Sequence, residues 1–260
     1  MSSTGEWRRM CADLAIVDDA DALALNKPVG ISVTGERHGT DLVRMAAEAG
    51  ETLYPVHRID KATSGLILFT RTLPAHGPLT RQFQQRTVDK TYLAVTASRD
   101  VPDHGVIDLP LSVGRKNRVR VAGRRDAIVR EGDTWTVPVD SDVTSYPSLT
   151  RFVVLWRNRR HTLLALRPVT GRRHQIRVHL AWIGHAIVGD PLFEPDPQTR
   201  TLLHSWRLSL DATWLDGERL TLEAKPGDDF IDAAGITNVD GMFAHAEKVL
   251  PALSTSEAVE

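Results

Sequence analysis

The chain has 260 residues, of which 42% are hydrophobic, and a net charge of -1, so it contains enough apolar material for a large core in a soluble protein. No apolar run approaches the roughly 18 residues that a membrane helix needs, and the N-terminus lacks the basic-then-apolar order of a signal peptide, so we expect a cytoplasmic protein without membrane contact. The single cysteine, Cys11, excludes an intrachain disulfide framework and every multi-cysteine metal site.

The first half of the chain predicts strands more often than helices. Residues 22–28 (ALALNKP) end at a proline and predict a strand that leads into a turn. The apolar run 66–70 (LILFT) predicts a central strand that is covered on both faces. Residues 79–86 favour a short amphipathic helix, and the alternation in 90–96 (KTYLAVT) is typical of a strand.

The second half predicts a strand pair and a helix. Residues 151–156 (RFVVLW) and 161–168 (HTLLALRP) flank a basic turn and indicate two paired strands. From His174 onward, apolar residues recur at helical spacing and predict a helix that packs on the sheet and ends near Gly184. These elements together predict an α+β fold with a mixed, mostly antiparallel central sheet flanked by helices.

Two regions stand apart from this expected core. Residues 113–150 are first basic, then acidic and proline-rich, which favours a long arm or insertion over a packed layer. The tail after Pro226 predicts one helix with Asp240 as its N-cap, and residues 254–260 (STSEAVE) predict disorder. We therefore expect one domain over residues 1–226 and a C-terminal helical extension over 227–260.

Charge is distributed unevenly along the chain. Residues 151–189 contain eight arginines and no acid, and residues 113–130 contain seven basic residues and only Asp126 as an acid. After Arg207, eleven acids face three basic residues. A basic middle with acidic ends is compatible with a cleft that binds a polyanion, whereas charge alone favours a set of solvated faces.

Two clusters of polar residues interrupt the apolar pattern. Residues 57–65 (HRIDKATSG) directly precede the central strand, and from local sequence an aspartate there organises a tight turn or serves catalysis. In residues 167–193 a strand ends at Thr170 and Gly171, and a helix opens with arginines and a histidine. Cations beside a helix N-terminus invite a negative partner.

Five separated stretches together resemble the RluA-type RNA pseudouridine synthases. They are the two clusters, with residues 57–65 carrying His-Arg-hydrophobic-Asp and Thr-Ser-Gly, and the segments 23–33 (LALNKPVGISV), 89–96 (DKTYLAVT) and 202–210 (LLHSWRLSL). The resemblance implies a pseudouridine synthase catalytic domain that isomerises specific uridines to pseudouridine in structured ribosomal or transfer RNA, without a cofactor. Many members carry an N-terminal S4-type domain, for which the residues before this core are too few.

The resemblance also implies three catalytic residues. Asp60 matches the catalytic carboxylate, which can attack as a nucleophile or act through a sugar intermediate. Tyr92 matches the tyrosine that stacks on the uracil and takes the proton from carbon 5, although period-2 alternation equally allows a packing role. Arg177 matches the arginine that pairs with the catalytic aspartate, and an arginine on an apolar helix needs an anion.

Further residues are expected to contact RNA. Arg58 matches a residue that fills the space of the departing base, or else contacts phosphate. The other expected RNA contacts are His57, Lys61, Thr63, Arg159, Arg160, Arg172, Arg173, His174 and Gln175. We expect no metal site, because His174 and His179 are about 140° apart around a helix and share no ligand face. Lys27 is expected to be structural, with a phosphate contact as the alternative.

Two other functions remain open from the sequence. One is a noncatalytic RNA-binding or RNA-chaperone protein on the same fold, and the other is a hydrolase that uses Asp60. A triad of Ser64, His57 and Asp60 is disfavoured, because side chains so close along one turn rarely converge and no nucleophile elbow is present. Asp60, Tyr92 and Arg177 together favour the enzyme, which we expect to act as a monomer on structured RNA.

Overall fold

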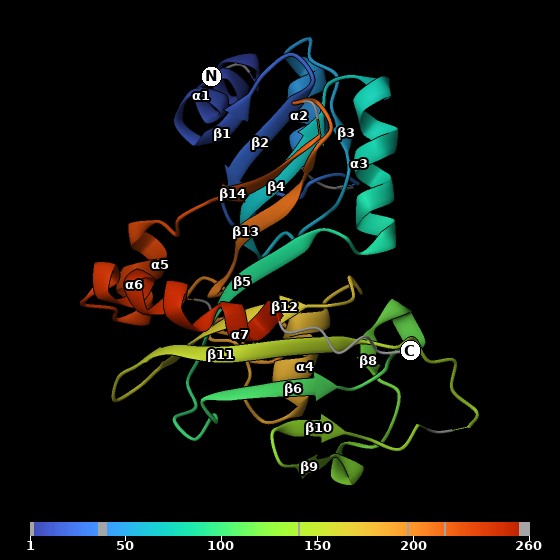
Figure 1. Ribbon diagram of the computed structural model, residues 1–260, viewed down its shortest axis with the longest axis vertical. Helices are drawn as coiled ribbons and strands as arrows, with labels where there is room; N and C mark the ends of the chain where they lie inside the picture. The colour runs from blue at the N-terminus through green and yellow to red at the C-terminus, as the bar shows by residue number, and fades with distance from the viewer. Residues whose placement is uncertain (1–2, 36–40, 140, 197, 216, 255–260) are drawn as a thin grey trace. The chain divides into compact units, whose positions relative to one another are not determined.

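The computed structural model describes residues 3–35, 41–139, 141–196, 198–215 and 217–254 (Figure 1). The chain divides into two compact units. Unit 1 consists of residues 1–90 and 203–226, and unit 2 consists of residues 91–202 and 227–260. The sequence indicates the boundary at residue 226, but it gives no sign that the chain leaves the first unit at residue 90 and returns to it at residue 203.

The described residues of unit 1 form three helices and the strands of a mixed sheet. Its strands are arranged in the order β1-β2-β4-β13, with β14 beside β13 and β3 beside β4. The elements are α1 (Ser3–Leu14), β1 (Ala15–Asp18), β2 (Ala22–Lys27), α2 (Leu42–Glu48), β3 (Tyr54–Pro55), β4 (Ser64–Thr70), α3 (Leu73–Gln85), β13 (Leu203–Ala212) and β14 (Glu218–Glu223). Every residue of β4 is buried, which confirms the predicted central strand.

The helices of unit 1 extend beyond the prediction. Helix α3 begins at Leu73, six residues before the predicted start, and contains Pro78. Its other proline, Pro74, lies in the first turn, where the missing N–H has no helical partner in any case. Helix α1 is not indicated by the sequence, yet it is fixed by fully buried Trp7, whose Nε1 donates to Glu51 Oε1 over 2.9 Å.

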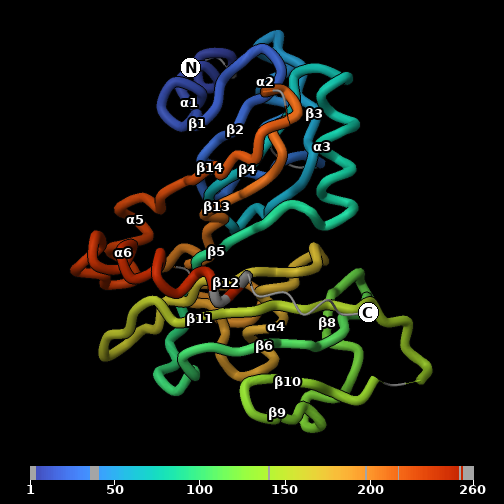
Figure 2. The backbone as a smooth tube through the Cα atoms, in the orientation of Figure 1, coloured from blue at the N-terminus to red at the C-terminus, as the bar shows by residue number. Residues whose placement is uncertain are grey.

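Unit 2 has a second set of strands, ordered β5-β12-β11-β6-β10-β9, and a separate β7–β8 hairpin. Helix α4 packs against β8, β11 and β12, and α6 and α7 lie along β11 (Figure 2). The elements are β5 (Asp89–Thr96, which starts at the unit boundary), β6 (His104–Asp108), β7 (Leu111–Val113), η1 (Arg115–Asn117), β8 (Val119–Val121), η2 (Arg125–Ala127), β9 (Val129–Glu131), β10 (Thr134–Thr136), β11 (Leu149–Arg157), β12 (Thr162–Pro168), α4 (Gln175–Trp182), α5 (Asp228–Ala234), α6 (Val239–Val249) and α7 (Pro251–Ser254).

The strand pairing confirms the predicted fold class. The pairs β4–β13 and β6–β10 are parallel. The antiparallel pairs include β1–β2, β2–β4, β3–β4, β5–β12, β6–β11, β7–β8, β9–β10, β13–β14 and the predicted β11–β12. The sheet strands are therefore mixed but mostly antiparallel, and helices flank them. Helix α4 starts at Gln175 and reaches its C-cap at Ile183, next to Gly184, as the sequence predicts.

The segment 113–150 is only partly the arm that its composition predicts. Its second half packs, because β10 pairs with β6 and Trp135 is buried with its ring 5.8 Å from that of Phe152. The strands here have three residues each, which is too short for alternation to be visible in the sequence.

Up to residue 254, the C-terminal tail forms three helices where the sequence predicts one. The N-cap of α6 is Asn238, whose side chain accepts a hydrogen bond from the Gly241 N–H over 2.9 Å. Asp240 therefore lies in the first turn and is not the cap. Met242 and Ala246, four residues apart, are buried on one face of this helix. The expectation of disorder concerns residues 254–260, of which 255–260 lie outside the described residues.

Candidate active site

Asp60 lies in a tight turn directly before β4. The backbone N–H of Thr63 donates to the Asp60 carbonyl over 3.0 Å, and the aspartate side chain is half-buried. Arg58 and Lys61, on either side of it, are exposed. Unit 1 therefore presents a carboxylate between two cations, on a loop whose end is fixed by a buried strand.

The Thr63-Ser64-Gly65 sequence attaches this loop to β13. The His204 ring must carry its proton on Nε2, because Nε2 lies 2.8 Å from the carbonyl of Ala224; Nδ1 then accepts from the Ser64 hydroxyl over 2.8 Å. Gly65 has φ +102°, and a Cβ atom there would lie 2.2 Å from the Ser205 carbonyl oxygen. Only glycine allows β4 and β13 to approach so closely. Thr63 is also buried, which supports a packing role for this motif, and the RNA contact expected for Thr63 stays a prediction.

His57 has a positioning role in the same loop. Its Nε2 accepts a hydrogen bond from the Leu68 N–H over 3.0 Å, and its ring stacks on Phe83 at 4.6 Å. Burial, with a smaller contribution from the positive charge of Lys90, lowers the pKa of His57 to about 3. A neutral, internally bonded ring carries no charge for phosphate, so we assign His57 to holding the loop on β4.

The loop that follows β2 is tied to the Asp60 loop. The ammonium group of fully buried Lys27 donates to the carbonyls of Pro28 and Ile31 over 2.8 and 2.9 Å. The Gly30 N–H donates to the Lys61 carbonyl over 2.9 Å. These contacts support the structural role that we expect for Lys27.

The remaining two predicted catalytic residues lie in unit 2. Tyr92 is half-buried on β5, opposite Leu166 of β12. Arg177 lies on α4, and its guanidinium forms a two-point ion pair with Asp190, with Nε–Oδ2 and Nη2–Oδ1 distances of 2.7 and 2.8 Å. The predicted pairing of Arg177 with Asp60 joins the two units and stays a prediction.

The sequence does not single out Asp190 as a partner of Arg177. The side chains of Arg177 and Asp190 are 5% and 0% exposed, so neither charge is solvated and each needs the other. Asp190 also accepts the Leu192 N–H over 2.8 Å. A signal was present, because Asp190 is the first acid after the acid-free run 151–189.

Gln175 is buried at the start of α4, and both ends of its amide are used inside the protein. Its Oε1 accepts from the Thr170 hydroxyl and the Arg172 N–H over 2.6 and 3.0 Å. Its Nε2 donates to the Leu149 carbonyl and the Thr150 hydroxyl over 2.9 and 3.0 Å. Both amide hydrogens are donated inside the protein, which supports a role for Gln175 in positioning the helix. The RNA contact expected for Gln175 stays a prediction.

His179 continues this network from the next turn of α4. Its Nε2 lies 3.0 Å from the Leu109 carbonyl, so Nε2 carries the proton and Nδ1 accepts from the Thr150 hydroxyl over 2.9 Å. Burial lowers the pKa of His179 to about 4, although the bond to Leu109 opposes the shift. Helix α4 is thus bonded to β11 through neutral polar groups, which keeps Arg177 in a fixed place.

The other predicted RNA-contacting cations lie at two ends of unit 2. Arg172, Arg173 and His174 precede α4, and Arg173 donates to the carbonyl and side-chain oxygens of Asn117 at the tip of the β7–β8 hairpin. Arg172 lies over the half-exposed Tyr146 ring at 5.3 Å. Arg159 and Arg160 lie in the β11–β12 turn. Because the ladder runs from Thr150↔Pro168 to Arg157↔Thr162, roughly 23 Å of strand separates that turn from α4's first turn.

No metal or membrane element is evident in the described part of the chain. Within those residues, no three or more histidine, cysteine or carboxylate side chains gather as metal ligands do. No helix there is both long and apolar enough to cross a membrane.

Comparison with known proteins identifies the family. The family model for RNA pseudouridylate synthase matches residues 21–182, so the chain belongs to the RNA pseudouridine synthases, which isomerise uridine in RNA. It is 36% identical over 214 residues to "Ribosomal large subunit pseudouridine synthase D" of Nitrosomonas europaea, covering 75% of this chain and 57% of that protein. It is 34% identical to "Dual-specificity RNA pseudouridine synthase RluA" of Vibrio cholerae, covering 69% of this chain and 68% of that protein.

Solved structures show the same fold. The structure of "Human RNA Pseudouridylate Synthase Domain Containing 4" is 22% identical to this chain and has a TM-score of 0.69, covering 89% of this chain and 95% of that one. The structure of "Human RNA Pseudouridylate Synthase Domain Containing 1" also has a TM-score of 0.69, at 20% identity, covering 95% of this chain and 96% of that one.

Proposed function

We propose that this protein converts specific uridines of a structured RNA to pseudouridine, with Asp60 as the catalytic carboxylate. The observation that carries the proposal is the construction of the Asp60 loop. Ser64 and Gly65 fix its end against β13, and His57 fixes its beginning on β4. A rigid carboxylate between the exposed Arg58 and Lys61 suits work on the ribose of a polyanion.

The roles of the other residues follow the family resemblance. Asp60 would attack the ribose or stabilise a sugar intermediate, Tyr92 would stack on the uracil and take the proton from carbon 5, and Arg177 would pair with Asp60. Asp190 supports the last role, because it holds the Arg177 guanidinium from one side in a two-point geometry. The reaction needs no cofactor.

The RNA substrate is proposed from the basic surface of unit 2 and from the names of the relatives. Arg115 and Arg118, at the hairpin tip, are exposed and have no ion-pair partner among the described residues. Large-subunit ribosomal RNA is the first candidate, since one relative is named for it, and transfer RNA is the second. We further propose that the protein acts in the cytoplasm as a monomer.

The test is Asp60→Asn, which is nearly isosteric but cannot act as a carboxylate. We expect it to abolish pseudouridine formation, measured by mapping pseudouridines in cellular RNA and by tritium release from 5-tritiated uridine, while RNA affinity stays within a few-fold. Asp13→Asn is the matched control, because Asp13 is exposed in α1. Full activity of Asp60→Asn would refute the proposal.

A second variant separates the enzyme from a noncatalytic RNA-binding protein. Tyr92→Phe keeps the ring and removes the hydroxyl, so we expect it to bind RNA but fail to release tritium. If the wild-type protein binds RNA and forms no pseudouridine in any cellular RNA, the RNA-binding alternative replaces the enzyme.

A further inference from the structure

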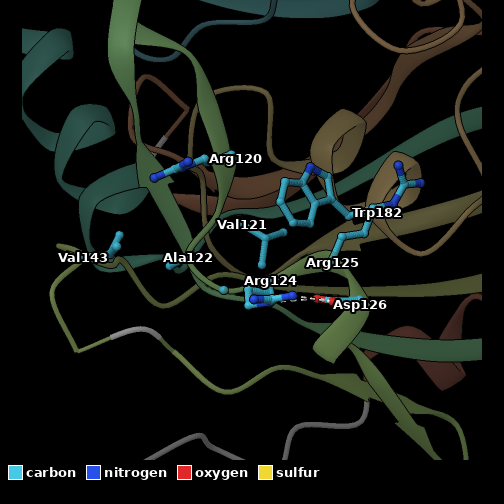
Figure 3. Close-up of a pocket in the computed structure, with 9 residues that line it drawn as sticks. Arg120, Val121, Ala122, Arg124, Arg125, Asp126, Val143 and Trp182 are labelled. Atoms are coloured by element: carbon cyan, nitrogen blue, oxygen red, sulfur yellow. Dashed lines mark hydrogen bonds and ion pairs between the residues drawn. The ribbon is translucent and has the colours of Figure 1, made fainter.

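A cavity of about 460 Å³ lies in unit 2, outside the residues assigned to catalysis. Its wall comes from the end of β8, the segment that follows it, and the last residue of α4 (Figure 3). The lining residues are Arg120, Val121, Ala122, Gly123, Arg124, Arg125, Asp126, Val143 and Trp182. This volume falls within the range of roughly 300–1,000 Å³ that small-ligand sites occupy.

The cavity combines cations with one aromatic ring. Figure 3 shows the Trp182 ring above the Arg124–Asp126 ion pair, with Val121 between Trp182 and Arg120 in this view. The indole N–H has no acceptor among the described residues. An aromatic face beside arginines is the combination that binds a nucleotide, because the base stacks on the ring and the phosphate meets the guanidinium groups.

The charges of the cavity leave two arginines available. Asp126 is already matched by Arg124, whose Nε and Nη2 lie 3.0 and 2.6 Å from its two carboxylate oxygens. Arg120 has no ion-pair partner among the described residues. Within the described part of the chain, Arg125 donates only to the Ala181 carbonyl, over 2.6 Å, which fixes it at the end of α4 and gives its charge no carboxylate partner there.

The cavity is separate from the catalytic face of α4 but continuous with the basic hairpin. Trp182 follows Arg177 by five residues, which is about 140° around the helix, so the two side chains leave different faces. Strand β8 runs from the hairpin tip, which carries Arg115 and Arg118, to Arg120 and the cavity. A strand of RNA along β8 would reach the cavity, whereas a free nucleotide would have no use for the hairpin cations.

We propose that this cavity binds one unpaired nucleotide of the RNA substrate, with Trp182 stacking on the base and Arg120 and Arg125 contacting phosphate. This inference rests on the proposed RNA substrate. The site selects RNA in which a single-stranded nucleotide can enter the cavity, and a continuous duplex offers none.

The test measures binding, not catalysis. The probes are fluorescein-labelled single-stranded octauridylate and a 12-base-pair RNA duplex, followed by fluorescence anisotropy. Trp182→Leu should weaken octauridylate binding about 5- to 100-fold, the effect of losing one stacked base, and should affect the duplex far less. Trp182→Phe should restore most of the affinity. Trp156→Leu, which removes another half-buried tryptophan of unit 2, is the control and should leave binding unchanged.

Asp126→Asn provides a second test, in which the expected result is tighter binding, whereas loss of folding would weaken binding. It removes the one negative charge of the cavity and releases Arg124, so octauridylate should bind about two- to fivefold more tightly. Equal octauridylate binding by wild type and Trp182→Leu, equal losses in Trp182→Leu and Trp156→Leu, or weaker binding by Asp126→Asn would each overturn the proposal. Uridine monophosphate that binds as tightly as octauridylate would assign the cavity to a free nucleotide instead.

The outcome is independent of the catalytic proposal. If the wild-type protein forms no pseudouridine but binds octauridylate through Trp182, the proposed enzyme fails and the nucleotide site stands. If Asp60→Asn abolishes the reaction while Trp182→Leu binds normally, the enzyme stands and the nucleotide site fails.

Discussion

The two ends of the β11–β12 hairpin both carry exposed arginines, yet their surroundings differ. At the end beside α4, the β7–β8 hairpin contributes Arg115 and Arg118 with no acid between them, and the exposed Tyr146 ring lies under Arg172. At the turn end, Arg159 and Arg160 lie where α5 packs, since Asn158 and His161 bond to the carbonyls of Ala234 and Gly235.

This difference shows that the number of arginines along a stretch of sequence does not determine the charge at the surface. Helix α5 carries three aspartates, and its C-terminal carbonyls face the turn, so the field of Arg159 and Arg160 is partly cancelled. Several arginines of the same acid-free run are also paired, as Arg157 is with Asp103 and Arg177 with Asp190. The α4 end therefore offers the stronger attraction for a polyanion, and the following predictions test that difference.

The largest change in the free energy of unfolding is expected when the buried ion pair between Arg177 and Asp190, at the α4 end, is broken. Asp190→Asn leaves the buried Arg177 without a counter-charge and should lower the free energy of unfolding by about 3–5 kcal/mol. Asp103→Asn, which breaks the exposed pair with Arg157 at the turn end, should cost less than about 1 kcal/mol. Urea denaturation measures both.

A double variant checks the cause of that loss. Arg177→Met combined with Asp190→Leu removes both charges and should recover most of the stability, since an apolar pair needs no counter-charge. Equal small losses in Asp190→Asn and Asp103→Asn would show that the α4 end does not depend on the buried pair.

The second prediction concerns acid sensitivity at the α4 end. Folded His179 stays neutral down to a pKa of about 4, whereas in the unfolded chain it is protonated below its ordinary value of 6.5. Between these two values the unfolded state binds more protons, so the free energy of unfolding falls as the pH falls. This group accounts for up to roughly 1.4 kcal/mol per pH unit in that window.

His179→Gln cannot titrate, so its free energy of unfolding should fall less steeply on acidification than that of the wild-type protein. His57 contributes to the remaining slope in both proteins, because its pKa is lowered as well. Urea unfolding at several pH values gives the two slopes, and identical slopes would contradict a neutral His179 in the folded state.

The third prediction compares two matched pairs of arginines in hairpin turns. Arg115→Gln with Arg118→Gln should weaken RNA binding and reduce the salt dependence by roughly 0.7–0.9 per lost phosphate contact. Arg159→Gln with Arg160→Gln should do so much less. Anisotropy titrations across a range of salt concentrations distinguish the two ends, and an equal loss for both pairs would assign RNA to the turn end as well, as the sequence predicts.

The smallest change in stability is expected in the C-terminal tail, which packs near the β11–β12 turn. Asn238→Ala removes the N-cap of α6 and should cost about 1 kcal/mol. Asp240→Ala removes only a first-turn acid and should cost a few tenths of that amount. Thermal unfolding compares them, and a larger cost for Asp240→Ala would restore the cap that the sequence indicates.

Long apolar runs made part of the fold predictable from the sequence. In the buried strand β4, the β11–β12 pair and helix α4, the length or the spacing of the apolar residues indicates one type of element. The three-residue strands of 113–150 and helix α1 have neither, since Trp135 and Trp7 are single aromatic residues whose burial depends on distant partners.

The motifs of the candidate site were predictable from the sequence, but the hydrogen-bond partners of the residues within them were not. The sequence groups His57, Thr63 and Gln175 with the RNA-contacting residues because they are polar and adjacent to cations. Their actual partners, such as the Leu68 N–H and the Leu149 carbonyl, are backbone groups 11 and 26 residues away. Local sequence does not indicate such partners, because they become neighbours only in the folded protein.

The contact between Gly65 and Ser205 also bears on the order of synthesis. The parallel pairing of β4 with β13 joins segments that are separated by the whole of residues 91–202. A nascent chain that has not yet emerged past Ala212 lacks the strand on which the Asp60 loop is fixed, and closing so long a loop is entropically slow. The segment through β13 must therefore emerge from the ribosome before the Asp60 loop can take its shape. A product terminated before β13 would carry Asp60 without the strand that fixes its loop.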